Sequence, residues 1–236
     1  MKEIHRTNCN QFHCNHLHSR ACITKVPIFN HLSDKQLDEI IGTVTSAYFK
    51  KGELIYKPGE QSDSLYIVRS GRIKIYCLSE SGKEQLYRIL YPGDYTGELA
   101  LFRQSLHESF AEAMVDTEIC LINRNNLQAF LLKYPTIALH ILSEFSNRLD
   151  QTEKQAVWVA TEQVETRIAM YLIECFEKQK NLNIVLPMTR KDLASYLGTT
   201  PETISRKLAE LETQKLLKQI RSKIIQILDL EGLRAL

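Results

Sequence analysis

The sequence is short of several residue types, and each shortage excludes a class of protein. Among 236 residues there are only nine glycines and six prolines, too few for a collagen-like or proline-rich chain. No uncharged apolar run approaches the ~20 residues that a membrane span needs. The first 22 residues are polar and lack the apolar core of a signal peptide. Because the composition is otherwise ordinary, with 44% hydrophobic and 25% charged residues, we expect a cytoplasmic, globular protein with no membrane partner.

Enzyme motifs are missing as well. The sequence contains no Gly-rich nucleotide loop, no H-E-x-x-H and no paired-carboxylate motif, and no spacing marks a Ser-His-Asp triad. A catalytic metal needs converging ligands, an open position and a substrate pocket. We therefore predict that the protein is not an enzyme, and a metalloenzyme or thiol oxidoreductase is the least favoured alternative.

Cysteine and histidine are concentrated at the N-terminus. Three of the six cysteines and four of the seven histidines lie within the first 22 residues. A cytosolic chain keeps its thiols reduced, so this density indicates metal or redox chemistry. The plainer alternative is a tail that carries thiols without a function.

The spacing of Cys9, Cys14 and Cys22 is C-x4-C-x7-C, which is not the C-x2-C of a zinc knuckle. It is loose enough to surround a cluster larger than one ion. Iron–sulfur clusters are held by four thiolates, so a fourth cysteine has to come from elsewhere, with Cys77 and Cys120 as candidates. Cys77 also fits a strand core and Cys175 a helix core. Zinc held by the three cysteines and a histidine such as His13 or His16, or a thiol–disulfide switch, is the alternative.

The next part of the chain has the pattern of a β-sandwich or barrel. A short amphipathic helix is expected over 33–41, with Ser33 as its cap. Six of the nine glycines then fall between Gly52 and Gly97 and punctuate short β-type runs. The predicted strands are 53–56, 64–69, 72–78 and 84–90, with a further β stretch over 110–122.

A long helix is predicted to begin at Pro135. Its apolar positions step by four and three over more than three heptads, which favours a dimer seam over a helix packed only on its own domain. A second helix is expected over 165–179. The predicted seam residues are Leu142, Phe145, Leu149, Thr152, Ala156 and Val159.

The C-terminal part carries a helix-turn-helix pattern. Nine basic and six acidic residues lie between Pro187 and Leu236, a weak basic bias. Thr189 and Asp192 form a capping-box start, and Gly198 is a natural helix stop. Thr200 and Pro201 open a second helix, whose buried face is Ile204, Leu208 and Leu211.

Glu202, Ser205 and Arg206 then share the exposed face at the start of that second helix. Carboxylate, hydroxyl and guanidinium groups are all used to contact base edges in the major groove. A generic helical bundle would not explain this combination. A β-hairpin wing is expected over 215–228, where isoleucines alternate among basic residues.

These segments resemble the FNR branch of the cyclic-AMP-receptor-like regulators over nearly the whole chain. The resemblance is carried by S-L-Y-I-V-R-S-G at 64–71, P-G-D at 92–94, G-E-L at 97–99, H-E-S-F-A at 107–111, M-T-R at 188–190 and E-T-I-S-R at 202–206. It implies an α+β fold: a Cys/His-rich metal-binding tail (1–30), a sensory β-roll or jelly roll of the cyclic-nucleotide-binding type (31–134), a dimerisation helix (135–163) and a winged helix-turn-helix (164–236).

The resemblance also implies a function. In the FNR branch an oxygen-labile 4Fe–4S cluster controls a homodimeric transcription regulator that binds palindromic double-stranded DNA and acts with RNA polymerase, more often as an activator. Half-sites similar to TTGAT and ATCAA are expected. Cys22 and Cys120 stand where the third N-terminal ligand and the β-roll ligand are expected, so the implied ligands are Cys9, Cys14, Cys22 and Cys120. The implied DNA-contacting residues are Glu202, Ser205, Arg206, Thr189, Arg190, Thr200 and Thr203.

Two features depart from the family pattern, and a third residue bears on cyclic AMP binding. The cysteine spacing is longer than the usual C-x2-C-x5-C. Thr152 stands on the seam where an acidic residue is usual, which predicts a dimer that survives loss of the cluster. Glu108 occupies the arginine position of a cyclic-AMP pocket and would repel the phosphate, which argues against cyclic AMP as a ligand.

Overall fold

The computed structural model describes residues 7–8, 23–98 and 105–236, which form two compact units. The first unit combines the part of the chain up to residue 77 with residues 87–148. The second combines residues 78–86 with 149–236. Each unit has its own core, and the two are described separately.

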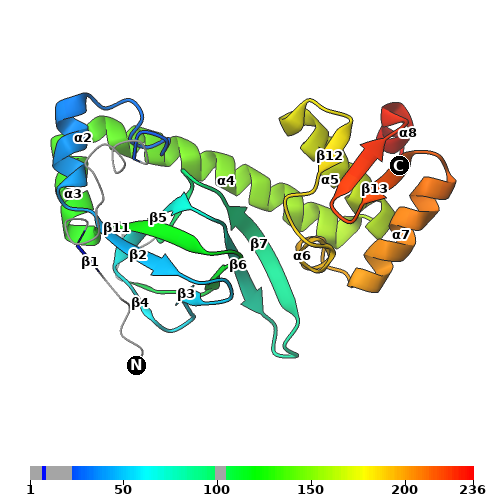
Figure 1. Ribbon diagram of the computed structural model, residues 1–236, viewed down its shortest axis with the longest axis horizontal. Helices are drawn as coiled ribbons and strands as arrows, with labels where there is room; N and C mark the ends of the chain where they lie inside the picture. The colour runs from blue at the N-terminus through cyan, green and yellow to red at the C-terminus, as the bar shows by residue number, and fades with distance from the viewer. Residues whose placement is uncertain (1–6, 9–22, 99–104) are drawn as a thin grey trace. The chain divides into compact units, whose positions relative to one another are not determined.

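Two antiparallel sheets form the β-roll of the first unit (Figure 1). One sheet has the strand order β1-β2-β11-β5-β8 and the other β3-β10-β6-β7, and β4 pairs with β9. The strands are β1 (Thr7–Asn8), β2 (Thr45–Phe49), β3 (Leu54–Tyr56), β4 (Gln61–Ser62), β5 (Ser64–Ser70), β6 (Ile73–Leu78), β7 (Glu84–Leu90), β8 (Tyr95–Thr96), β9 (Ser105–Leu106), β10 (Phe110–Ala113) and β11 (Thr117–Asn123).

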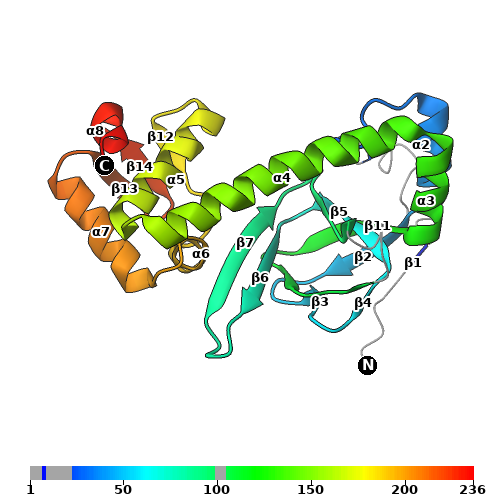
Figure 2. The same ribbon diagram turned by 180° about the vertical axis from the view of Figure 1, so that it is seen from behind.

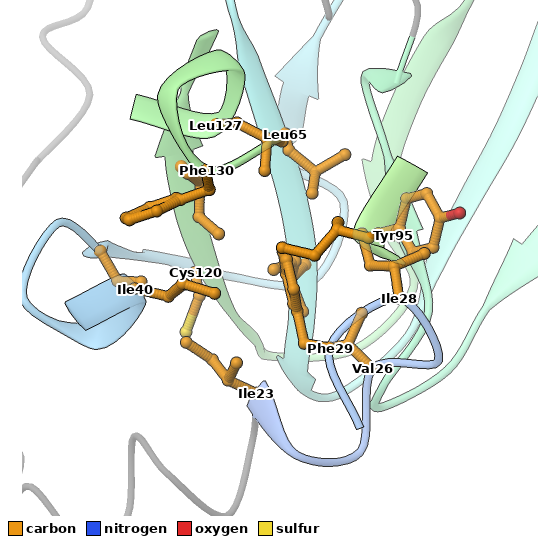
Figure 3. Close-up of a cluster of buried hydrophobic side chains, with 14 of the residues drawn as sticks. Ile23, Val26, Ile28, Phe29, Ile40, Leu65, Tyr95, Cys120, Leu127 and Phe130 are labelled. Atoms are coloured by element: carbon orange, nitrogen blue, oxygen red, sulfur yellow. The ribbon is translucent and has the colours of Figure 1, made fainter. Parts of the chain in front are cut away.

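Strand β11 is buried on both faces, because successive side chains of a strand point to opposite sides of the sheet. Ile119 and Leu121 belong to the core of the roll. Cys120 and Ile122 belong to a second core, which includes side chains of α2 and α3 and of residues 23–32 (Figure 3). Cys120 is thus covered by the segment that follows the N-terminal cysteines.

Helices α2 (Asp34–Ile41) and α3 (Arg124–Lys133) and the long helix α4 (Pro135–Thr161) contribute to this second core. The predicted cap of α2 is confirmed, since the backbone N–H of Ser33 donates to the side chain of Gln36 at 2.8 Å. Ile137 and Ile141 anchor the start of α4 in the core and are fully buried.

The second unit is a small helical domain with a three-stranded sheet of order β12-β14-β13 (Figure 2). The predicted helix-turn-helix is confirmed as α6 and α7, and the predicted wing as the hairpin β13–β14. The elements are α5 (Val164–Gln179), β12 (Asn183–Val185), α6 (Arg190–Tyr196), α7 (Pro201–Thr213), β13 (Leu217–Arg221), β14 (Ile224–Ile227) and α8 (Leu230–Arg234).

Some local expectations need correction. The single β stretch predicted over 110–122 is two strands in different sheets, because the chain turns between Ala113 and Thr117. Strands β2 and β12 and helix α3 were not anticipated. Cys175 is buried as predicted, whereas Cys77 is only half-buried because it lies near the end of β6.

Candidate nucleic-acid interface and sensor cysteine

Helix α6 begins at the capping box that the sequence predicts. The Thr189 hydroxyl accepts from the backbone N–H of Asp192 at 3.2 Å, and the Asp192 carboxylate accepts from the backbone N–H of Thr189 at 3.1 Å. These bonds satisfy two backbone donors that a helix start leaves unpaired. Thr189 therefore fixes the start of the helix-turn-helix.

The turn between α6 and α7 needs a glycine. Gly198 has a φ of +68°, and a Cβ added there would lie 3.0 Å from Cγ1 of Val159 on α4. Arg167 on α5 donates from Nη1 to the carbonyl oxygen of Leu197 at 2.8 Å, which satisfies the end of α6. The angle between the two helices is therefore set by contacts within the second unit.

Helix α7 has two distinct faces. Ile204, Leu208 and Leu211 are fully buried, while Glu202, Ser205 and Arg206 are exposed. These are the two sets predicted from the 3.6-residue period. Ala209 is also exposed and extends the exposed side by a small apolar residue. The i+7 spacing from Glu202 could have identified it.

The exposed face presents both acceptors and donors. The backbone N–H at the start of α7 and the Thr200 hydroxyl lower the pKa of Glu202, so its carboxylate is ionised at neutral pH. The Ser205 hydroxyl donates to the carbonyl oxygen of Pro201 at 2.9 Å, and Arg206 pairs with Glu210 at 3.1 Å. An ion pair this exposed is weak. The Arg206 guanidinium can therefore leave Glu210 and donate to another acceptor.

The remaining predicted contact residues have partners inside the domain. Thr200 caps α7 by accepting from the backbone N–H of Thr203 at 3.3 Å, and the two hydroxyls are 3.2 Å apart. Arg190 is half-buried and donates to the side chain of Gln219 on β13 at 2.8 Å. Each of these residues therefore has a structural role within the domain, in addition to its predicted contact with DNA.

In the first unit, Glu98 of the G-E-L motif lies between two arginines. Arg88 donates to Oε1 of Glu98 at 3.0 Å, and Arg148 of α4 donates to the same oxygen at 2.5 Å. Burial raises the pKa of Glu98, but the two cations outweigh it and leave the pKa below its ordinary value. Glu98 is thus ionised and held by side chains of the protein.

Cys120 is the one predicted cluster ligand within the described residues, and it is 2% exposed. Figure 3 shows its sulfur directed toward Ile23, which is fully buried in the same core. Cys9, Cys14 and Cys22 lie outside the described residues. Within the described ranges, no group of three or more Cys, His, Asp or Glu side chains could hold a metal ion.

Comparison with known protein families matches both units. A model of the cyclic nucleotide-binding domain matches residues 47–134, and a model of the Crp-like helix-turn-helix domain matches residues 166–236. The chain belongs to the Crp/FNR family of transcription regulators. Its two domains are those of regulators and not of enzymes.

Relatives of this Crp/FNR regulator match over almost its full length. "Probable transcriptional regulator flp" of Lacticaseibacillus casei is 32% identical over 215 residues, which is 91% of this chain and 97% of that protein. The fumarate and nitrate reduction regulatory protein of Vibrio cholerae is 31% identical over 220 residues, which is 90% of this chain and 87% of that protein. The structure of FixK2 from Bradyrhizobium japonicum aligns with a TM-score of 0.70 and 27% identity, covering 82% of this chain and 96% of that one.

Helix α4 of this Crp/FNR regulator carries an exposed apolar stripe. Leu142 and Leu149 are 58% and 60% exposed, and Thr152 and Ala156 are exposed as well. Phe145 packs partly against the Cys120 core, and Val159 lies against Gly198. The predicted seam therefore contains two residues that also contact their own unit.

In the described part of the chain, no helix is both long and apolar enough to cross a membrane.

Proposed function

We propose that the protein is an oxygen- or redox-responsive transcription regulator that binds FNR-type palindromic DNA as a homodimer. The observation that carries the DNA-binding half is the exposed set Glu202, Ser205 and Arg206 on α7, opposite a fully buried face. A recognition helix contacts base edges through its N-terminal residues, and a dimer places two such helices in successive major grooves.

The chemistry of this face fits half-sites similar to TTGAT and ATCAA. The ionised Glu202 carboxylate accepts from the amino group of cytosine, and Arg206 donates to guanine of the same base pair. Ser205 contacts a thymine. The flanking residues Thr189 and Thr203 are proposed to add contacts to the phosphate backbone.

The sensor is proposed to be a 4Fe–4S cluster held by Cys9, Cys14, Cys22 and Cys120. Four thiolates are the usual ligands of such a cluster. Cys22 directly precedes Ile23, toward which the Cys120 sulfur points. Strand β1 ends one residue before Cys9, and its Thr7 pairs with Ser46 of β2, which in turn pairs with Cys120. The described residues on either side of the cysteine segment, Asn8 and Ile23, therefore belong to the sheet and the core that hold Cys120.

When bound, the cluster would supply an oxygen-sensitive link between the tail and the roll. The contribution of the protein is to present Cys120 from a buried strand and to carry α4 on the same core through Ile137 and Ile141. A change at the tail can thereby act on the packing of α4, and so on the distance between the two recognition helices. Loss of the link is proposed to lower DNA affinity.

The test is the iron, acid-labile sulfide and zinc content of protein purified without oxygen, together with its visible spectrum before and after air. We expect about four irons and four sulfides per chain and bleaching in air. Cys120→Ser should lose both the cluster and specific DNA binding. Cys175→Ser is the matched control, because Cys175 is also buried but lies in the second unit.

A zinc ion or a thiol–disulfide switch is the second candidate, favoured by the four histidines at positions 5, 13, 16 and 18. One zinc per chain, or no metal and two oxidisable thiols, with no spectral change in air, would establish it in place of the cluster. DNA binding by α7 is independent of this outcome.

RNA polymerase is the partner proposed for activation. Cyclic AMP is not proposed as the effector, although a cyclic nucleotide-binding model matches the roll. Glu98 already pairs with Arg88 and Arg148, and the carboxylate of Glu108 would repel a cyclic phosphate.

A further inference from the structure

Arg190 is turned toward the wing, here defined as the β13–β14 hairpin of residues 217–227. Its Nη2 donates to Oε1 of Gln219 at 2.8 Å, and its Nε donates to the carbonyl oxygen of Ser222 at 3.4 Å. One guanidinium therefore holds two points of the wing, one within strand β13 and one at the hairpin turn. Such a two-point contact uses the rigid fork of arginine, which lysine lacks.

Gln219 extends this contact to α7. Its backbone N–H donates to Oε1 of Glu212 at 3.0 Å, and its Nε2 donates to Oε2 of the same carboxylate at 2.9 Å. The backbone N–H and side-chain amide of Gln219 lower the pKa of Glu212, which is therefore ionised. The amide of Gln219 thus lies between a cationic donor and an anionic acceptor, an arrangement that strengthens both hydrogen bonds.

The three nitrogens of Arg190 are all withdrawn from solvent or already bonded. Nη2 and Nε contact the wing, and Nη1 is buried without a hydrogen-bond partner in the described chain. To reach a phosphate, the guanidinium would have to leave Gln219 and Ser222. This geometry favours an internal role over direct contact with DNA.

We propose that Arg190 is a positioning residue. The hydrogen-bonded series Arg190–Gln219–Glu212 fixes the wing with respect to α7. Arg221 at the end of β13 and Lys223 in the wing turn are both exposed. The hydrogen-bonded series therefore determines where these two cations lie beside the recognition helix. The proposal rests on α7 being the DNA-contacting helix. Under it, Arg190 adds to DNA affinity through the wing and not through a phosphate of its own.

The experiment is a double-mutant cycle on the full-length dimer with a labelled FNR-type palindrome and an unrelated duplex. Arg190→Lys keeps the charge but removes the fork, and Gln219→Leu removes the acceptor without changing any charge. Both variants, their combination, the charge-removing Arg190→Gln and the control Lys191→Gln are measured over a range of salt concentrations. Lys191→Gln removes a neighbouring exposed cation. Hydrogen exchange of the wing amides is followed in the DNA-free proteins.

We expect Arg190→Lys and Gln219→Leu each to weaken palindrome binding by about three- to tenfold, and the double variant to be no weaker than the poorer single one within about twofold. The slope of log affinity against log salt concentration should be the same in the two single variants as in the wild type. The wing amides should exchange faster in both variants and at the wild-type rate in Lys191→Gln.

Two results would overturn the proposal. One is wild-type affinity for Arg190→Lys together with a salt slope that falls by about 0.9 per subunit in Arg190→Gln, which is the sign of a phosphate contact. The other is additive effects in the cycle with unchanged exchange of the wing. If the wild type does not prefer the palindrome to unrelated DNA, the proposed half-site is wrong, while the exchange data still decide the role of Arg190.

Discussion

At the scale of single residues, the exposed face of α7 could be predicted because helical periodicity alone separates it from the buried face. Glu202, Ser205 and Arg206 needed no tertiary information. Arg190 could not be assigned in this way. Its neighbour in space, Gln219, is 29 residues away in the sequence, and only the fold brings the wing to the start of α6.

Replacing Arg206 tests the base contact. Arg206→Ala should cost roughly 1–3 kcal/mol in binding to the palindrome and should reduce discrimination at the single G·C pair of each half-site. Fluorescence anisotropy with matched duplexes that differ only at that pair measures both effects. Arg234→Ala is the control, because Arg234 is in a comparable exposed ion pair with Glu231 on α8. Unchanged discrimination in Arg206→Ala would show that another residue contacts the pair.

Glu98 predicts how the stability of the β-roll depends on pH. Because its pKa is lowered in the folded state, the carboxylate stabilises the fold fully above its ordinary pKa of 4.5. This contribution is lost as the pH falls through the lower folded value. Glu98→Gln should destabilise the protein at pH 7 by about 1–3 kcal/mol. That is less than for a fully buried pair, since Arg148 and Arg88 stay 21% and 30% exposed.

Urea unfolding of the two proteins at pH 7 and at pH 3.5 measures this contribution. The difference between wild type and Glu98→Gln should shrink at the lower pH. Glu153→Gln removes an exposed carboxylate of α4 and should leave stability nearly unchanged at both values. A difference that stays constant with pH would mean that the Glu98 charge contributes nothing to the fold.

At the scale of elements, those with strong local signals were predicted and those held by distant contacts were missed. The long helix was identified from a heptad pattern, and α6 and α7 from their caps. Strand β12 has only three residues, and it is held by pairing with Ile224–Gln226 of β14, far along the sequence. Helix α3 buries only Leu127 and Phe130, too few to form a clear period.

The apolar stripe of α4 predicts the effect of a charge placed on it. Leu149→Asp should weaken the proposed dimer by tenfold or more, because a buried charge at an interface core is costly. The fold of each chain should be unaffected, since Leu149 is 60% exposed. Sedimentation velocity over a range of concentrations measures the dimer. Leu132→Asp, at an 85% exposed site on α3, should dimerise like the wild type. Equal dimerisation of the two variants would place the interface elsewhere.

At the scale of the whole molecule, the sequence predicts metal or redox chemistry for the tail but not how its cysteines are arranged. Its cysteine spacing is compatible with a cluster, with zinc or with a disulfide, because thiolates serve all three and their geometry depends on packing. The buried position of Cys120 beside Ile23 depends on the tertiary fold and cannot be derived from the spacing of cysteines in the sequence. It shows where the fourth proposed ligand lies, while the chemistry of the cysteine tail stays a proposal.

The seam residue Thr152 links that chemistry to the oligomeric state. In the proposed dimer, a neutral side chain there provides no repulsion between subunits, so the protein without the proposed cluster should remain a dimer in air. Thr152→Asp would bring two carboxylates together across the seam, and the like charges should dissociate the cluster-free dimer while the intact cluster still supports it. Sedimentation velocity before and after air exposure measures this. Asn147→Asp adds the same charge at an exposed position of α4 outside the seam and should stay dimeric throughout. If wild type and Thr152→Asp both become monomers in air, the dimer of this regulator depends on the tail and not on Thr152.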